Sequence, residues 1–285
     1  MEIIGIVGNL ILVAPITNLL VGLYKLFVLV GLPGPLGWSI LSISVLIRLL
    51  MWSLTAKQIK STQKMVQLKP HLEIIKKQYG HDKTRHMQEQ QKLYKEHGIN
   101  PMAGCLPLLL QMPIFIALYN VFNSVLGGDG GISKFVEHFN NQVAYFGFLR
   151  LDETLNVNFL GTSLISRPME WQTIGWWILL IPVGTALLQL VQSKMMMPKP
   201  PVVAVRDSKK EIKEKESTEE MMTQIQGQML FLMPLMFGFI SYQLPVGLAV
   251  FWNTLTIFGI IQQYKITGLG GLEPWMTKLS KQPKN

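Results

Sequence analysis

Arg48 lies near the middle of a hydrophobic stretch, and its chemistry is the hardest in this sequence to explain without a function. A guanidinium group in hydrocarbon costs roughly 2.5 to more than 10 kcal/mol, and its pKa above about 12 prevents neutralisation. None of the five stretches that we predict to span a membrane contains Asp or Glu. We therefore expect water, or an acidic group from another chain, to reach Arg48. Either solution indicates a polar cavity inside the bilayer.

Other polar side chains have the spacing needed to lie beside Arg48. Ser44, Arg48, Trp52 and Thr55 follow the pattern i, i+4, i+8 and i+11, which predicts one shared face of a continuous helix. Arg48 precedes Lys57 by nine residues, or about 13 Å of helix, so its side chain is too deep simply to reach the end of the helix.

The other hydrophobic stretches contribute uncharged polar residues, namely Gln111, Thr185, Gln189, Asn253, Thr254 and Thr256. If these residues converge on Arg48, they form a hydrated, positively charged groove. The alternative is that each pairs one helix with another, a contact worth only about 0.6 kcal/mol within a membrane. Both interpretations stay open for the uncharged residues, whereas helix pairing would leave Arg48 without a counterion.

Enzymatic functions find little support in the sequence. No predicted span contains His or Asp, which argues against serine–histidine and aspartyl intramembrane proteases. His71, His81, His86 and His97 have a spacing that matches no metal motif, and the single Cys105 excludes a multi-cysteine metal site. No phosphate-binding glycine loop is present. We expect no enzymatic activity, no metal and no cofactor.

The elements that position these residues are predicted to be transmembrane helices. The 285 residues are 49% hydrophobic and only 15% charged, whereas soluble domains contain about 25% charged residues. We expect an all-α integral membrane protein whose residues 1–35 form an external segment with an amphipathic helix over 15–30. Stretches of about 20 apolar residues predict five spans: 36–56, 101–125, 172–192, 226–243 and 246–264. The alternative for the N-terminal segment is a sixth span over 3–30.

The charges of the loops predict the orientation of these spans. Segment 57–100 contains ten Lys or Arg and four acidic residues, whereas 127–170 contains three and five. Basic residues collect on the cytoplasmic side. We therefore expect a cytoplasmic helical hairpin over 57–100 and an external loop over 126–171. A cytoplasmic linker (193–225) and a basic cytoplasmic tail (265–285) complete a topology with the N-terminus outside a bacterial cell membrane and the C-terminus in the cytoplasm.

The basic hairpin could attract phosphate groups without reading bases, or it could be a solvated surface. The hairpin residues that we expect to make contacts are Lys69, Lys76, Lys77, Lys83, Arg85, Lys92 and Lys95.

Several motifs resemble the YidC/Oxa/Alb family of membrane protein insertases, and together they cover about residues 14–268. The most specific is the run from Asn100-Pro101 to Ile114-Phe115, which resembles the second core span of that family. The other matching segments are Ile47–Gln58, Lys69-Pro70, Ile75–Gly80, Leu93–Gly98, Pro245–Leu248, Phe251-Trp252 and Gln262-Gln263.

The resemblance implies a fold of five spans around a hydrophilic groove that opens to the cytoplasm and the lipid and is closed toward the outside. It implies that the chain inserts newly made membrane proteins and helps them fold, alone or with the Sec translocon. It also places Arg48, Gln111 and Trp252 in the groove. With the polar residues above, the expected groove residues are Arg48, Ser44, Thr55, Gln111, Gln189, Trp252, Asn253 and Thr256.

The resemblance further implies partners: nascent membrane-protein clients, the ribosome, the Sec translocon, the signal-recognition pathway and the lipid bilayer. It implies no sequence-specific nucleic acid and a functional monomer. We expect a short form of the family without the large periplasmic domain.

Two features depart from the family pattern. Many members carry Asn at the position of Thr256, whereas here Asn253 directly follows Trp252, and the external loop is longer than usual. Two other classes of protein fit the polar residues. One is a small anion channel or transporter that uses Arg48 as its selectivity charge, and the other is a passive scaffold within a translocon.

Overall fold

The structure is a computed structural model that describes residues 13–99, 106–126, 131–151, 155–197 and 218–273, and most of these residues are helical. The chain divides into two compact units. The first unit comprises residues 1–52, 105–188 and 236–258, and the second comprises residues 53–104, 189–235 and 259–285.

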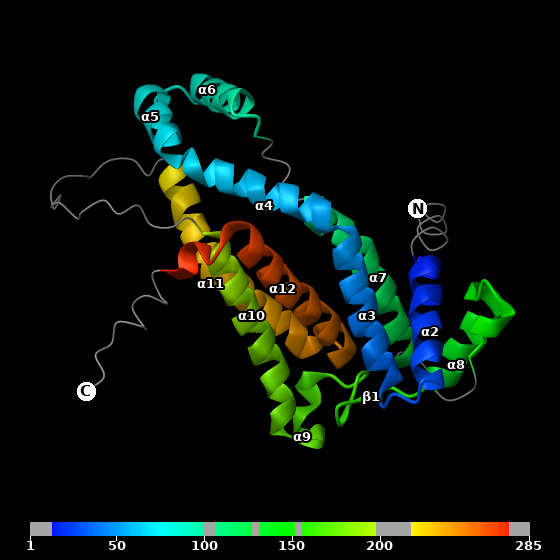
Figure 1. Cartoon of the computed structure of the whole chain (residues 1–285). Helices are drawn as coiled ribbons and strands as arrows, with labels where there is room; N and C mark the ends of the chain where they lie inside the picture. Colours follow the sequence, from blue (N-terminus) through cyan, green and yellow to red (C-terminus); the bar gives the residue numbers. More distant parts are fainter. Residues whose placement is uncertain (1–12, 100–105, 127–130, 152–154, 198–217, 274–285) are drawn as a thin grey trace. The chain divides into compact units, whose positions relative to one another are not determined.

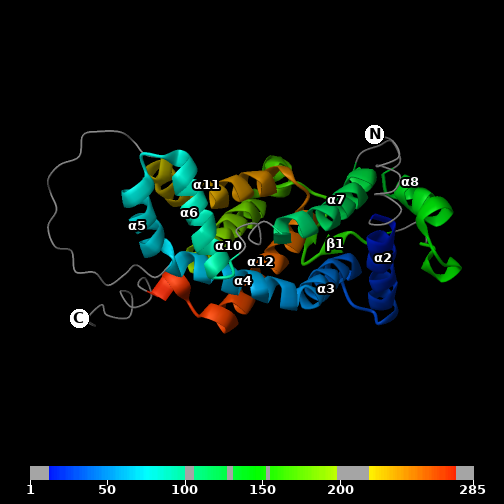
Figure 2. The same ribbon diagram turned by 90° about the horizontal axis from the view of Figure 1, so that it is seen from above.

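The first unit contains α2 (Ala14–Leu29), which packs against both α3 (Pro35–Leu50) and α7 (Leu106–Leu126) (Figures 1 and 2). α2 and α3 each carry Pro in their first turn, where the missing N–H has no helical partner to lose. The core of the unit consists of almost fully buried apolar side chains: Ile40, Ile43, Leu118, Phe122, Phe139, Leu164, Ile178, Leu248 and Phe251.

After α7, the external segment predicted over 126–171 folds into short elements. α8 (Gly131–His138), the π-helical turn η3 (Phe139–Val143) and the 3-10 turn η4 (Gly147–Leu149) come first. β1 (Asn158–Phe159) then pairs with β2 (Thr162–Ser163) in a short antiparallel hairpin. The turn η5 (Pro168–Glu170) and α9 (Trp171–Ile174) follow.

The β-hairpin docks on the start of α3 through Phe159. A Cβ added to Gly37 would lie only 2.1 Å from the Phe159 ring, so this close approach requires glycine. Trp38 contacts the same ring edge-on at 5.7 Å. This part of the external segment is therefore packed into the first unit.

Within the described part of the chain, two helices are long and apolar enough to cross a membrane, judged by length and composition. One is Trp176–Met196, which combines the turn η6 (Trp176–Leu179) with α10 (Leu180–Met196), and the other is α12 (Val246–Thr267). α3 and α4 (Trp52–Gln67) together give a third candidate, interrupted at Met51. The shorter apolar helices are Ala14–Leu29, Ile114–Asn123 and Phe231–Gln243, the last within α11 (Thr218–Gln243). Residues 101–105 of the predicted span 101–125 lie outside the described residues.

The helix that carries Arg48 is not continuous over 36–56. α3 ends at Leu50, Met51 has φ −88° and ψ 4°, and α4 begins at Trp52. The prediction that Trp52 and Thr55 share one unbroken helical face with Ser44 and Arg48 is therefore wrong. No Pro or Gly marks the break in the sequence, so residue types alone did not reveal it.

The second unit contains most of α4 and a hairpin formed by α5 (Lys69–Tyr79) and α6 (Lys83–Glu96) (Figure 1). Asp82 caps α6, because its side chain accepts hydrogen bonds from the backbone N–H groups of Thr84 and Arg85 at 3.0 and 3.1 Å. The hairpin lies in the segment 57–100, for which the sequence predicts one. The unit also contains the turn η7 (Gly270–Leu272) after α12.

Candidate functional site

Arg48 lies in the last turn of α3, and its Nε atom is buried. Among the described residues, this Nε has no hydrogen-bond partner. A buried donor without a partner costs about 1–3 kcal/mol, and more when the group is charged. Such a group is typical of a site that binds water, an ion or another molecule.

Three further residues that the sequence predicts to line the groove share this property. Gln111 Nε2 and Asn253 Oδ1, in the first unit, and Gln189 Oε1, in the second, are buried without a hydrogen-bond partner among the described residues. Gln111 offers a donor and Asn253 an acceptor, so the first unit contains both kinds of unpaired group together with a cation.

The hydroxyl residues of the predicted groove behave differently. Ser44 is fully buried, and its hydroxyl donates to the Ile40 carbonyl oxygen one turn earlier. Thr256 is also buried, and its hydroxyl donates to the Trp252 carbonyl oxygen at 3.0 Å. These two hydroxyls are satisfied within their own helices.

Thr55 takes part in a pair between helices of the second unit. Its hydroxyl and the amide of Gln262 exchange two hydrogen bonds, at 3.0 and 2.8 Å, and both side chains are buried. In the first unit, the Thr185 and Ser241 hydroxyls lie 3.2 Å apart and join α10 to α11. For Thr185 the structure thus shows helix pairing, the alternative that the sequence left open.

Trp252 joins three helices of the first unit. Its ring stacks on Phe237 of α11, with centroids 4.6 Å apart, and meets Phe115 of α7 edge-on at 6.1 Å. Gln111 precedes Phe115 by one helical turn and so lies on the same face of α7. The face of α7 that bears Gln111 therefore packs toward the part of α12 that bears Trp252 and Asn253.

The basic residues of the α5–α6 hairpin are mostly exposed. Lys77, Lys83, Arg85, Lys92 and Lys95 are exposed, Lys76 is partly buried, and the side chain of Lys69 is outside the described residues. The Arg85 guanidinium of α6 lies 5.2 Å from the centre of the Tyr79 ring of α5, a cation–π contact between the two helices.

The sequence did not predict that Gln58 is a buried polar residue. Gln58 of α4 is only 7% exposed, and neither atom of its amide has a hydrogen-bond partner among the described residues. Gln58 follows Thr55 by three residues and lies on the same side of α4. That spacing was the available signal, but the predicted span ended at residue 56 and left Gln58 in the hairpin segment.

The apolar helices are typical of a helical membrane protein, and the first unit adds buried polar groups without hydrogen-bond partners among the described residues. The sequence model of the family described as 60Kd inner membrane protein matches residues 28–269. The chain belongs to this family.

Curated relatives carry the name Membrane protein insertase YidC. The proteins from Rickettsia prowazekii (strain Madrid E) and Rickettsia typhi (strain ATCC VR-144 / Wilmington) are 33% and 32% identical to this chain over 240 residues. Each alignment covers 83% of this chain and 36% of the relative. The chain therefore spans about a third of the length of these relatives.

A solved structure shares the fold. It is described as an active YidC insertase crystal structure with the first transmembrane domain resolved, and it superposes with a TM-score of 0.53 at 24% sequence identity. The match covers 87% of this chain and 45% of that chain. The likeness supports the helical fold. It does not assign roles to individual residues.

Proposed function

We propose that this chain is a membrane protein insertase that receives short polar segments of its clients in a hydrated groove around Arg48. The observation that carries the proposal is the buried Arg48 Nε, which has no hydrogen-bond partner among the described residues. The names of the curated relatives support the same activity.

The groove would work by lowering the cost of moving polar groups into the bilayer. Arg48 attracts an acidic client tail, since an opposite charge at short range is strongly favourable where water is scarce. Gln111 Nε2 can donate to a backbone carbonyl, and Asn253 Oδ1 can accept from a backbone N–H. These groups match the hydrogen-bonding needs of an unfolded segment.

The apolar segment of the client would leave the groove sideways into lipid. Its transfer is driven by burial of apolar surface, worth roughly 25 cal/mol per Å². The insertase thus needs no nucleotide and no bond chemistry, because the free energy comes from the client. In this proposal the five-span groove opens to the cytoplasm and the lipid and is closed to the outside, with the N-terminus outside and the C-terminus in the cytoplasm.

The exposed cations of the α5–α6 hairpin would attract the ribosome or the nascent chain, since phosphate groups and acidic segments are their natural counterions. The Sec translocon and the signal-recognition pathway are further proposed partners.

Reconstitution of the purified protein into liposomes with one small client tests the function. We expect Arg48→Ala to reduce insertion of a client with an acidic tail by about tenfold or more, since charge-assisted hydrogen bonds contribute about 1.5–3 kcal/mol. Insertion of a matched client with a neutral tail should change much less. Arg150→Ala, which removes an exposed arginine of the external segment, is the control. Normal insertion of acidic-tail clients by Arg48→Ala would contradict the proposal.

The same liposomes separate the other classes of protein. An anion channel predicts ion flux without client, and a passive scaffold predicts no insertion by the purified protein. The insertase predicts insertion that depends on client, without flux.

A further inference from the structure

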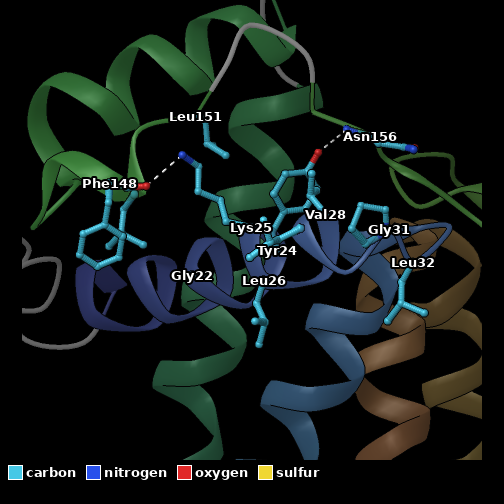
Figure 3. Close-up of a pocket in the computed structure, with 13 residues that line it drawn as sticks. Gly22, Tyr24, Lys25, Leu26, Val28, Gly31, Leu32, Phe148, Leu151 and Asn156 are labelled. Carbon is cyan, nitrogen blue, oxygen red and sulfur yellow. Dashed lines mark hydrogen bonds between the residues drawn. The ribbon is translucent and has the colours of Figure 1, made fainter.

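The first unit contains a pocket of about 790 Å³ between α2 and the external segment, and Arg48 does not line it (Figure 3). One wall is formed by α2 and the turn that follows it, and the other by Phe148, Leu149, Leu151 and Asn156. Pockets that hold small molecules have volumes of about 300–1,000 Å³.

The walls of this pocket are fixed by hydrogen bonds. The backbone N–H of Asn156 donates to the Tyr24 hydroxyl at 2.9 Å, and the Lys25 ammonium donates to the Phe148 carbonyl oxygen at 2.9 Å (Figure 3). Tyr24 is buried. The pocket is thus a built feature of the fold, held by contacts between residues more than a hundred positions apart.

Lys25 gives the described part of the pocket a positive charge. Among the described residues that line it, Lys25 is the only charged one, and none is acidic. An ammonium group has three donors, and the hydrogen bond to Phe148 uses one of them. The pocket is therefore suited to an anionic group.

The rim of the pocket is apolar and exposed. Leu26 is 50% exposed, Leu29 is 85% exposed and Phe148 is 72% exposed. Such side chains next to a cation are typical of helices that lie in a membrane interface, where the apolar residues contact acyl chains and the cation contacts headgroups.

We propose that this pocket binds one anionic phospholipid, with the lipid phosphate at Lys25 and the acyl chains along Leu26 and Leu29. The lipid would fill the space between α2 and the external segment and so anchor that segment to the membrane surface. This site is separate from the groove proposed above, and its occupancy does not depend on insertase activity.

Native mass spectrometry of the full chain tests the site after reconstitution into nanodiscs that contain equal amounts of phosphatidylcholine and phosphatidylglycerol. We expect the wild type to retain one phosphatidylglycerol molecule in preference to phosphatidylcholine. Lys25→Gln should lower this preference about fivefold, since one basic residue near a membrane surface contributes about that factor in affinity. Lys134→Gln removes an exposed lysine of α8 that does not line the pocket, and it should leave the preference unchanged.

A second variant keeps the test decisive if Lys25→Gln does not fold. Gly22 lines the pocket, and a Cβ at this position would meet Leu149 at an ordinary contact distance of 3.5 Å. Gly22→Leu should therefore fill the pocket and abolish retention of the lipid while Lys25 stays in place. Retention of phosphatidylglycerol by both variants would overturn the proposal. The proposal would also be overturned if inorganic phosphate stabilised the detergent-solubilised protein as much as phosphatidylglycerol does, and if this stabilisation depended on Lys25. The site would then select a free anion.

Discussion

Apart from Trp252, the polar residues of the first unit that we predict to line the groove fall into two chemical groups. Ser44 and Thr256 carry short hydroxyls that reach a carbonyl oxygen one turn earlier in the same helix, so each satisfies itself. Arg48, Gln111 and Asn253 each carry a buried atom without a hydrogen-bond partner among the described residues. The second group therefore makes the better candidates for contact with the client that we propose, although both groups are polar in the sequence.

Arg48→Lys separates charge from geometry. If the proposed function holds, we expect this variant to keep most of the insertion activity toward acidic-tail clients, because attraction in the proposed groove depends on the positive charge and Lys retains it. Arg48→Gln should be as defective as Arg48→Ala. The measurement is the insertion rate in liposomes. If Arg48→Lys fails as badly as Arg48→Gln, the client requires the planar, forked guanidinium and simple charge attraction is not the mechanism.

Contacts between helices and the external segment organise the first unit. The side chain of Asn18 on α2 donates to the Val143 carbonyl and accepts from the Tyr145 N–H, at 2.8 and 2.9 Å. The first N–H groups of α12, at Val246 and Gly247, donate to carbonyl oxygens of the external segment at 2.9 and 2.8 Å. The external segment thus satisfies a helix end that would otherwise lack partners.

The close approach of α12 to α7 depends on Gly247. A Cβ at this position would lie 2.0 Å from the Phe122 ring, so Gly247→Ala should destabilise the protein by about 1–3 kcal/mol through overpacking. Thermal unfolding of the detergent-solubilised protein measures the loss, and Phe122→Leu should restore part of it. Gly184→Ala is the matched control, because a Cβ there would meet no described atom within 4 Å beyond its chain neighbours and the backbone of its own helix. An unchanged unfolding temperature for Gly247→Ala would show that the two helices are not this close.

The pair between Thr55 and Gln262 links α4 to α12 within the second unit. We expect Thr55→Val to lower the free energy of unfolding by about 1–2 kcal/mol, because a buried amide loses a partner. The double variant, with Thr55→Val and Gln262→Leu, should lose less free energy of unfolding than the sum of the losses in the two single variants. The expected coupling energy is about 0.6–1.7 kcal/mol.

The free energies of unfolding of the wild type, the two single variants and the double variant are measured in mixed micelles. Thr254→Val is the control, since the Thr254 hydroxyl donates to Val250 in its own helix. Strictly additive effects of Thr55→Val and Gln262→Leu would exclude an energetic role for the pair.

For the molecule as a whole, family membership and the apolar helices establish a membrane protein, whereas its orientation rests on the charges of its loops. The α5–α6 hairpin carries the exposed cations, and the folded external segment carries exposed aromatic side chains such as Phe146 and Phe148. Basic residues prefer the cytoplasmic side and aromatic residues prefer the membrane interface.

Labelling of single cysteines tests the orientation. In a Cys105→Ala background, we expect Gln142→Cys of the external segment to react with an impermeant maleimide in intact spheroplasts. Gln91→Cys of α6 should react only after lysis. Both positions are exposed, so a difference in labelling reports the side of the membrane and not burial. The reverse pattern would invert the proposed topology.

Local properties of the sequence were enough to predict a helical membrane protein and a helical hairpin after α4, because hydropathy and charge are properties of each residue and its near neighbours. Tertiary structure alone decided the break at Met51, the docking of Phe159 on Gly37 and the pairing of Thr55 with Gln262 across 207 positions. The physical reason is that a buried polar group must find its partner in three dimensions, and residue spacing along one helix does not say which distant side chain will supply it.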